Sequence, residues 1–328
     1  MRVLVTGGAG FIGSHFVRTM LAGGYPGYED AEVTVVDKLT YAGDIRNLPS
    51  GHPRLGVVRG DLCDERLLRR VLPGHAEVVH FAAESHVDRS VAGAREFVHT
   101  NVLGTQTLLD ACLESDVDTV VQVSTDEVYG SIAEGSWTEA EPLLPNSPYA
   151  ASKAGADLIA RSYQRTHGLD VRITRCSNNY GPRQHPEKLV PRFITNLLDG
   201  LPIPLYGDGR NVREWVHVED HCRGIHLVLA HGRAGEIYNI GGGTERSNIE
   251  LSHRLLELCG AGTELIRWVP DRKGHDLRYS IDDAKIRTEL GYHPVRDLDE
   301  GLHEVVAWYR ENRGRWRTES IGPPAEVP

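Results

Sequence analysis

The residues best suited to chemistry lie in the stretch VSTDEVYG, residues 123–130. An apolar, β-prone run ends at Val123, and the hydroxyl of Thr125 and the carboxyl groups of Asp126 and Glu127 follow it. A hydroxyl at a strand end is common in nicotinamide-dependent enzymes, where it positions a substrate alcohol. Moving a hydride needs no pair of adjacent acids. These two carboxyl groups therefore either serve a further proton transfer or are solvated carboxylates on a loop.

A second candidate group is the Y-x-x-x-K pair of NSPYAASK, residues 146–153. Ser147 is suited to cap a helix and Pro148 to its first position, so Tyr149 and Lys153 would share one helical face. An ammonium group beside a phenol lowers the phenol pKa from its usual value of about 10. Tyr149 would then act as a base near neutral pH. A surface pair without function is the alternative for this motif taken alone.

The glycine-rich stretch TGGAGFIG, residues 6–13, predicts a dinucleotide site. It matches G-x-G-x-x-G through Gly8, Gly10 and Gly13, and G-x-x-G-x-x-G through Gly7, Gly10 and Gly13. It follows the first predicted strand and opens the first predicted helix, which places a helix N-terminus against a pyrophosphate. A glycine-rich turn that binds no ligand is the alternative.

Two acidic residues at strand ends could complete the cofactor site. Asp37 ends the second predicted strand, where a carboxylate accepts hydrogen bonds from ribose hydroxyls and repels a 2′-phosphate, so NAD is favoured over NADP. A turn-forming aspartate is the alternative, and the neighbouring Lys38 weakens the preference. Asp61 could reach the adenine amino group or could cap the helix predicted over residues 64–71.

Strands and helices alternate along the first half of the chain. Near-continuous apolar runs predict strands over residues 2–6, 33–37, 55–61, 77–83, 119–125 and 171–177, and helical spacing is found at residues 13–21, 64–71 and 94–114. This alternation predicts a Rossmann-type, doubly wound parallel sheet covered on both faces. After Ser177 the rhythm breaks into loops rich in proline and glycine, followed by shorter elements. We therefore expect a smaller C-terminal α/β substrate domain.

The predicted domains are residues 1–177, which bind NAD, and residues 178–328, which bind substrate. We expect the two to be interleaved, with elements near residues 205–235 returning to the first domain. The tail GPPAEVP has no apolar pattern and is predicted to be disordered from about residue 318.

Composition excludes several classes of function. The 328 residues carry 36 basic and 46 acidic side chains, and this net charge of −10 argues against binding nucleic acid. No apolar run approaches the length of a membrane span, and because the N-terminus leads directly into a predicted strand we expect no signal peptide. The five cysteines are widely spaced and lack a C-x-x-C pair, which is typical of buried thiols in a reducing compartment. A cytoplasmic location is expected.

Taken in order, the glycine loop, the acidic second strand, the strand-end hydroxyl and Y-x-x-x-K resemble the extended short-chain dehydrogenase/reductase superfamily. Within it the chain is similar to the dTDP-glucose 4,6-dehydratase family over residues 1 to about 312. The stretches that carry this resemblance are KLTYAGD (38–44), AAESHVDRS (82–90), STDEVYG (124–130), NNYGPRQHPEKLVP (178–191) and DRKGHDLRY (271–279). One departure is Lys273, where the family pattern has proline.

The resemblance implies a lyase that converts dTDP-glucose to dTDP-4-keto-6-deoxyglucose and water. NAD oxidises carbon 4, water is eliminated across carbons 5 and 6, and the hydride returns to carbon 6. Asp126 would be the acid and Glu127 the base of the elimination. Thr125 would bind the carbon-4 oxygen, and Tyr149 with Lys153 would serve the oxidation.

The resemblance also implies binding residues at named positions. The implied cofactor-binding residues are Gly7, Gly10, Phe11, Ile12, Gly13, Asp37, Lys38, Leu39, Thr40, Asp61, Leu62, Phe81, Ala82, Ala83, Ser85, Thr100, Tyr149, Lys153 and Asn179. The implied substrate-binding residues are Ser85, Thr125, Asn178, Lys188, Leu189, Pro204, Tyr206, Arg213, Asn248, Asp271, Arg272 and His275. Arg213 suits this role because a pyrophosphate favours the guanidinium fork.

Other functions remain to be separated from this one. A nucleotide-sugar 4-epimerase of the same fold would share the glycine loop and Tyr149–Lys153 but needs no elimination acid and base. A nucleotide-sugar decarboxylase would need to grip a carbon-6 carboxylate, and a non-catalytic NAD-binding regulator would have no need for an intact tyrosine and lysine. We expect no metal, because His217 and His221 are interpreted as structural. A homodimer through a four-helix bundle, built from residues 94–114 and 148–166, is also expected.

Overall fold

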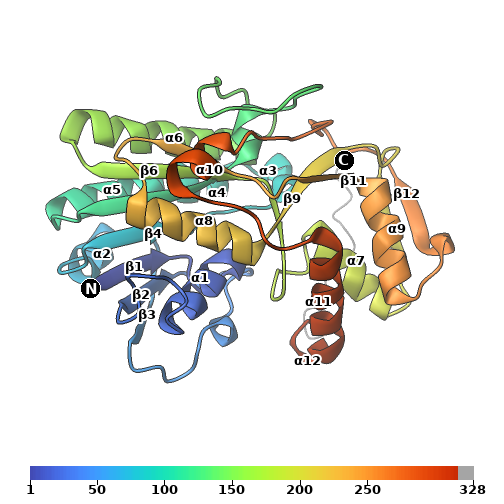
Figure 1. Cartoon of the computed structure of the whole chain (residues 1–328), viewed down its shortest axis with the longest axis horizontal. Coiled ribbons are helices and arrows are strands. Elements are labelled where there is room, and N and C mark those ends of the chain that lie inside the picture. Colours follow the sequence, from blue (N-terminus) through green and yellow to red (C-terminus); the bar gives the residue numbers. More distant parts are fainter. Residues whose placement is uncertain (317–328) are drawn as a thin grey trace.

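The core of the protein is one large parallel sheet. The computed structural model describes residues 1–316, and the predicted disordered tail lies outside them. In this range seven strands pair in the order β10-β6-β5-β4-β1-β2-β3 (Figure 1), which confirms the predicted doubly wound sheet. Their bounds are β1 Arg2–Thr6, β2 Glu32–Asp37, β3 Leu55–Arg59, β4 Glu77–His80, β5 Thr119–Thr125, β6 Asp170–Cys176 and β10 Ile237–Ile240.

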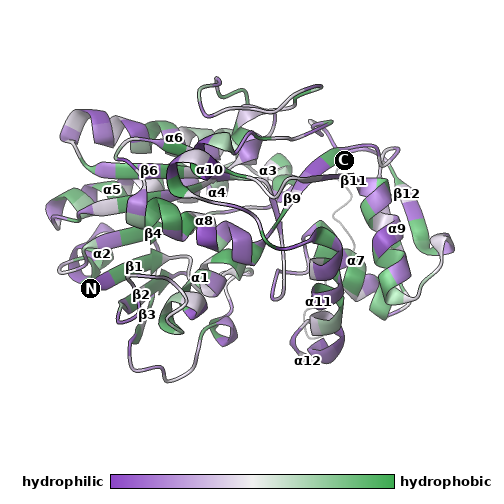
Figure 2. Cartoon of the chain, viewed as in Figure 1, coloured by the Kyte–Doolittle hydropathy of each residue, from purple (hydrophilic) through white to green (hydrophobic). Residues whose placement is uncertain are grey.

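The alternation of side chains along the strands explains why both faces of this sheet are covered. On β1, Val3 and Val5 belong to one hydrophobic cluster, while Leu4 between them belongs to another. The first cluster includes residues of α1 (Phe11–Leu21), α8 (Val218–His231) and α10 (Ala284–Leu290). The second includes residues of α2 (Glu65–Val71), α5 (Gly104–Glu114) and α6 (Pro148–His167). Figure 2 shows predominantly hydrophobic strands between helices of mixed character.

Two predicted strands are shorter in the structure than in the sequence pattern. β3 ends at Arg59 and β4 ends at His80, so Asp61 and Ala83 lie in loops. Both loops leave the carboxyl edge of the sheet, where backbone groups turn away from the strand ladder. The residues beyond each strand, among them Asp61 and Ala83, line a cavity at this edge.

The helix predicted over residues 94–114 is not a regular α-helix. It consists of α4 (Arg95–Phe97), a π-helical segment over Val98–Leu103, and α5. The π segment carries buried Asn101, whose amide accepts a hydrogen bond from the backbone N–H of Glu84 and donates to the Glu84 carbonyl. π segments inside helices are frequent at functional sites, and this one fixes the loop after β4.

A second, smaller group of elements packs around its own hydrophobic cluster, on the right in Figure 1. In the described part of the chain it has a three-stranded sheet, β11-β9-β7, and a two-stranded sheet, β12-β8. The strands are β7 Asn178–Tyr180, β8 Ile203–Tyr206, β9 Val212–His217, β11 Thr244–Ser247 and β12 Ile266–Val269. The helices near them are α3 Val87–Ala92, α7 Leu189–Leu198, α9 Asn248–Cys259, α11 Leu298–Glu311 and α12 Arg313–Trp316.

The chain returns to the large sheet after entering this second group. α8 packs against the sheet, and β10 pairs with β6 through Ile237 and Ile240. The expected return near residues 205–235 includes α8 but ends before β10, and it also takes in β9, which belongs to the three-stranded sheet. The sequence did not predict β10, because the four-residue run IYNI is too short to distinguish a strand from other structure. The domain limits themselves stay a prediction.

Candidate active site

Two adjoining cavities lie at the carboxyl edge of the large sheet. The glycine-loop cavity runs along the loops after β1, β2, β4 and β5, and the cationic cleft lies between α3, α7, β8 and β9. Glu127, Asn178, Glu187 and Lys188 line both, so the two cavities meet at these side chains.

Nearly all predicted cofactor residues line the glycine-loop cavity. They are Gly7, Gly10, Phe11, Ile12, Gly13, Asp37, Lys38, Thr40, Asp61, Leu62, Phe81, Ala82, Ala83, Ser85, Thr100, Tyr149, Lys153 and Asn179. The side chain of Leu39 does not line this cavity, and its contact with the cofactor stays a prediction. Its backbone has a positive φ of 56°, and its side chain packs against the core cluster beside α1.

The glycine loop is shaped so that the backbone can approach a ligand. Gly7 has a φ of +66°, and a Cβ there would lie 2.6 Å from the backbone nitrogen of Ala82. A Cβ on Gly13 would lie 2.5 Å from the carbonyl oxygen of Gly7. The first turn of α1 has no side-chain cap and no acidic residue, so its positive end is available to a pyrophosphate.

Asp37 both forms a turn and faces the cavity. Its carboxylate accepts hydrogen bonds from the backbone nitrogens of Leu39, at 2.8 Å, and Ala9, at 2.9 Å. The turn interpretation and the cofactor interpretation are therefore compatible, because each carboxylate oxygen retains a second lone pair. The nearby ammonium group of Lys38 lies 2.8 Å from a carboxylate oxygen of Asp61, which partly neutralises it.

Asp61 is not the cap of α2. The side chain of Asp64 accepts a hydrogen bond from the Leu67 nitrogen and fills that role, while Asp61 accepts one from the Cys63 nitrogen. A helix cap must immediately precede the first helical residue, and Asp64 rather than Asp61 does so. Asp61 instead lines the glycine-loop cavity next to Leu62.

The five predicted catalytic residues come together in the glycine-loop cavity. Thr125 ends β5, which is buried along its whole length, and Asp126 and Glu127 begin a 3-10 helix over Asp126–Tyr129. Tyr149 and Lys153 lie on α6, whose cap is Ser147 and whose first residue is Pro148, as the sequence predicts. Burial of β5 explains the placement, because it fixes the point at which the hydroxyl and the carboxyl groups leave the sheet.

The environments of the two carboxyl groups differ. Burial, with the charge of Glu127, raises the pKa of Asp126 well above its usual range. Its Oδ1 accepts a hydrogen bond from Thr125 at 3.2 Å, and its buried Oδ2 has no partner among residues 1–316. Burial also raises the pKa of Glu127, but the charges of Arg272, Lys188 and Arg213 oppose that effect. Asp126 is therefore suited to be an acid, and Glu127 is the more readily ionised of the two.

The phenol of Tyr149 does not have the lowered pKa that the sequence predicts. Burial raises the pKa of Tyr149 well above 10, and the charge of Glu127 adds to the effect. Lys153 donates a hydrogen bond to the carbonyl of Val123 at 2.8 Å, and burial lowers the pKa of Lys153 itself. In the protein without its cofactor, desolvation is the largest effect on the pKa of both groups. The sequence prediction considered the charge of Lys153 and not the burial of the pair.

The cationic cleft contains most of the predicted substrate residues. Those lining it are Asn178, Lys188, Leu189, Pro204, Tyr206, Arg213, Asn248, Arg272 and His275, while Ser85 and Thr125 line the glycine-loop cavity. Asp271 does not line the cleft, and its contact with substrate stays a prediction. Its exposed carboxylate lies 2.6 Å from Nδ1 of His275 and orients that ring instead.

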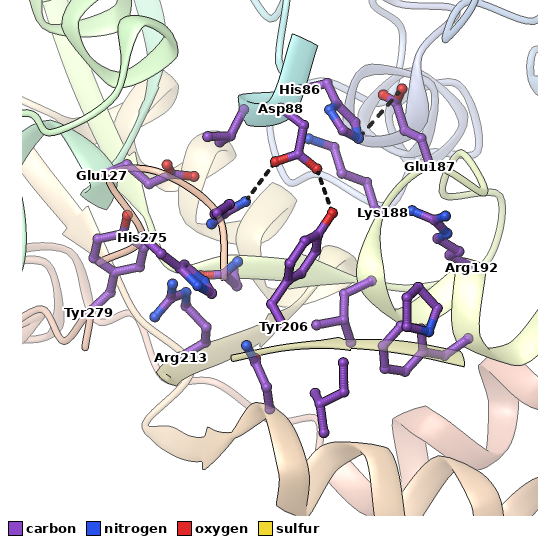
Figure 3. Close-up of a pocket in the computed structure, with 18 of the residues that line it drawn as sticks. His86, Asp88, Glu127, Glu187, Lys188, Arg192, Tyr206, Arg213, His275 and Tyr279 are labelled. Atoms are coloured by element: carbon purple, nitrogen blue, oxygen red, sulfur yellow. Dashed lines mark hydrogen bonds and ion pairs between the residues drawn. The ribbon is translucent and has the colours of Figure 1, made fainter. Parts of the chain in front are cut away.

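Interactions among the lining residues hold their charged groups in place. The guanidinium of Arg213 donates to the carbonyls of Val212 and Asp276 and lies 4.3 Å from the ring centroid of Tyr279. Asp88 links two others, because it accepts a hydrogen bond from the Tyr206 hydroxyl at 3.3 Å and lies 3.6 Å from Arg272 (Figure 3). A rigid set of cations is suited to a diphosphate.

Sequence reasoning missed several residues of this cleft. His86, Asp88, Glu187, Arg192 and Tyr279 line it, and Figure 3 shows their side chains around the same space. Most of them lie in stretches that carry the family resemblance, but no residue type singled them out. Only contacts between segments far apart in the chain identify them. The carboxylate of Glu187, for example, lies 3.3 Å from Nε of Arg89 and 4.0 Å from Nε2 of His86.

Two histidines that could have suggested a metal have structural partners. His217 accepts a hydrogen bond from the Glu219 nitrogen and caps α8, and Nδ1 of His221 lies 2.9 Å from the Asn179 side-chain oxygen. Within residues 1–316, no cluster of three or more possible metal ligands is found.

The comparisons with known proteins agree with this geometry. The family model described as GDP-mannose 4,6 dehydratase matches residues 4–305. The dTDP-glucose 4,6-dehydratase of Actinoplanes sp. is 59% identical over 319 residues, covering 96% of this chain and 100% of that protein.

Solved structures give the same result. That of DesIV, a dTDP-glucose 4,6-dehydratase from Streptomyces venezuelae with NAD and TYD bound, has a TM-score of 0.96 and 65% identity, covering 97% of this chain and 99% of that one. UDP-glucose 4-epimerase from Thermotoga maritima has a TM-score of 0.88 and 32% identity, covering 95% and 99%. The predicted resemblance is confirmed, and the chain belongs to the nucleotide-sugar dehydratase family that includes the dTDP-glucose 4,6-dehydratases.

Proposed function

We propose that this protein is an NAD-dependent lyase that converts dTDP-glucose to dTDP-4-keto-6-deoxyglucose and water. The observation that carries the proposal is the pair of carboxyl groups, Asp126 and Glu127, placed with Tyr149 and Lys153 in the glycine-loop cavity, where Glu127 also reaches the cationic cleft. The high identity to dTDP-glucose 4,6-dehydratases supports the same reaction.

The residues of the site divide the proton transfers between them. NAD, when bound along the glycine loop, supplies hydride acceptance at carbon 4 and hydride return at carbon 6. Tyr149 takes the proton of the carbon-4 hydroxyl, and Thr125 binds the oxygen. Glu127 takes the proton from carbon 5 while Asp126 donates one to the carbon-6 hydroxyl, which departs as water. Glu127 then returns a proton to carbon 5 as the hydride returns to carbon 6, and the proton taken by Tyr149 balances the one that Asp126 gave to the departing water, so the enzyme and cofactor are restored.

The protonation states support these roles. Asp126 must hold a proton at neutral pH in order to donate it, and its buried environment favours the neutral form. Glu127 must accept a proton, and the three cations around it favour the charged form. For Tyr149, a positively charged nicotinamide ring in the same cavity would favour the phenolate, which burial alone disfavours.

Two variants separate oxidation from elimination. Tyr149→Phe lacks the base for the carbon-4 hydroxyl, so added substrate should leave the bound cofactor oxidised. Glu127→Gln keeps that base and loses the one for carbon 5, so reduced cofactor should accumulate, visible by its absorbance. Each lost group is expected to slow turnover by about 100- to 10,000-fold.

A third variant and a mass measurement complete this test. Asp126→Asn should resemble Glu127→Gln, with a smaller loss if solvent supplies the proton. Mass spectrometry of the product from wild-type protein should show loss of one water. An unchanged mass with active hydride transfer would indicate a 4-epimerase, and normal turnover by Glu127→Gln would remove the assigned base.

We also propose that the protein is a cytoplasmic homodimer joined by a four-helix bundle. On the segments expected to form it, Val98, Leu103 and Leu158 are each 44–55% exposed, which is unusual for three apolar side chains on neighbouring helices. In the described residues, no helix is long and apolar enough to cross a membrane, and all five cysteines are free thiols.

The dimer is tested by its mass in solution. Wild-type protein at micromolar concentration should have twice the mass of one chain in light scattering. Leu158→Glu should shift the population toward the monomer, because a charge would be buried in the interface. Leu201→Glu, a change at an apolar residue 52% exposed outside these helices, is the matched control and should stay dimeric. A monomeric wild-type protein would contradict the proposal.

A further inference from the structure

A buried ion pair lies directly behind the catalytic helix. The guanidinium Nε of Arg175 lies 2.9 Å from Oδ2 of Asp157, and the two side chains are 1% and 0% exposed. Removing two charges from water is costly, and a buried pair often adds little to the free energy of unfolding. Stability alone therefore does not explain why this pair is buried here.

The pair is aligned with the predicted catalytic residues. Tyr149, Lys153 and Asp157 are spaced four residues apart on α6, so their side chains follow one face of the helix. Arg175 lies on β6, the strand that pairs with β5 and its end residue Thr125.

Asp157 is the negative charge that acts on Lys153. The ammonium donates to the Val123 carbonyl on β5, and the titratable groups that interact with it are His80 on β4, Cys176 on β6 and Asp157 on α6, with Tyr149 one turn away on the same helix. Burial lowers the pKa of His80 to about 3 and raises that of the Cys176 thiol, so both are neutral at pH 7. Burial lowers the pKa of Lys153, and the charge of Asp157 is the largest effect that opposes it.

Arg175 also connects this helix to the two catalytic carboxyl groups. Its guanidinium lies 4.7 Å from the ring centroid of Tyr129, the last residue of the 3-10 helix that begins at Asp126. The Tyr129 hydroxyl donates to Oδ1 of Asn239 on β10, at 2.9 Å. The ion pair thus contacts both elements that carry the proposed chemistry.

We propose that Asp157 is a positioning residue that keeps Lys153 protonated in its buried site, while Arg175 holds the Asp157 carboxylate in place. This role rests on the proposed function, because it matters only if Lys153 assists Tyr149 in the oxidation of carbon 4. Asp157 itself touches neither cavity.

The test is the pH dependence of the first hydride transfer in Asp157→Asn. The rate of cofactor reduction in a single turnover is measured against pH, and its fall at high pH is the alkaline limb. Without the Asp157 charge, Lys153 would lose its proton at lower pH, so this limb should move down by about one to three pH units. Asp170→Asn is the matched control. Asp170 forms a 2.6 Å ion pair with Arg172, and both lie on β6 at the end away from the site. It should leave the alkaline limb at its wild-type pH.

A second variant keeps the test decisive if Asp157→Asn fails to fold. Asp157→Asn combined with Arg175→Gln removes both buried charges, so no unpaired charge remains in the core. Its alkaline limb should still lie below that of the wild type, because Asp157 and not Arg175 is among the charges that act on Lys153. An unshifted limb in either folded variant would overturn the proposal.

A measurement without substrate separates this proposal from the proposed function. The pH dependence of Lys153 acetylation in the full-length protein, read by peptide mass spectrometry, should move to lower pH in the same variants. If this profile moves but no cofactor is reduced by dTDP-glucose, the role of Asp157 stands and the proposed function fails. If it does not move, the role of Asp157 is wrong whatever the reaction.

Discussion

The two cavities are built in different ways. The glycine-loop cavity is formed by the ends of neighbouring strands, and its closest approaches involve backbone atoms, such as Gly7 beside Ala82. The cationic cleft is formed by side chains from distant segments, among them the cations Lys188, Arg213 and Arg272. The chain as a whole has a net charge of −10, so these cations form a local exception to its overall negative charge.

The difference indicates how each cavity tolerates change. Recognition by backbone is insensitive to many side-chain substitutions but fails when a Cβ fills the space of the ligand or of the loop. Recognition by side chains tolerates small shifts of backbone but fails when one charge is removed. Three predictions test this contrast.

The largest effect is expected for Gly7→Ala. The added Cβ would meet the Ala82 backbone at 2.6 Å and would force a left-handed φ on alanine, which together cost about 2–6 kcal/mol. The purified protein should contain little NAD. Gly23→Ala is the matched control, since Gly23 also has a positive φ, of +73°, but its Cβ would meet nothing within 4 Å. Equal NAD content in the two variants would contradict a backbone-built site.

A smaller effect, on the other cavity, is expected for Arg213→Gln. Removing this buried charge should cost about 2–5 kcal/mol of substrate binding, or about 30- to 5,000-fold in KM, with NAD content unchanged. Arg210→Gln on the same segment is the control, because Arg210 pairs only loosely with Asp208 and its side chain is 81% exposed. A normal KM in Arg213→Gln would mean that the cleft does not bind the diphosphate through this residue.

The smallest effect is expected where a side chain acts within the glycine-loop cavity. Asp61→Asn would release Lys38 from an ion pair whose side chains are 31% and 50% exposed, worth about 0.2–1 kcal/mol. The freed ammonium should improve NADP binding by a factor of about 1.4 to 5, measured by titration of both cofactors. Asp64→Asn, which leaves Lys38 paired, should not change the preference. Loss of NAD binding in Asp61→Asn beyond this range would show that Asp61 contacts the cofactor directly.

Sequence alone determined the parts of the site that are local in the chain. The glycine loop, Asp37, the Thr125–Glu127 run and the Tyr149–Lys153 pair each lie at a strand end or on one helical turn, where short-range spacing fixes which side chains meet. The family resemblance, now supported by high identity, then assigned the reaction.

Only the tertiary structure decided the charge states and the distant partners. The side chain of Leu39 packs against the core and that of Asp271 lies against His275, and Glu187 lines both cavities although nothing in its local pattern marks it. The raised pKa of Tyr149 follows from burial. The ion pair between Asp157 and Arg175 follows from the packing of α6 against β6. Desolvation depends on every segment that packs around a group, and the spacing of residues along a chain does not contain that information.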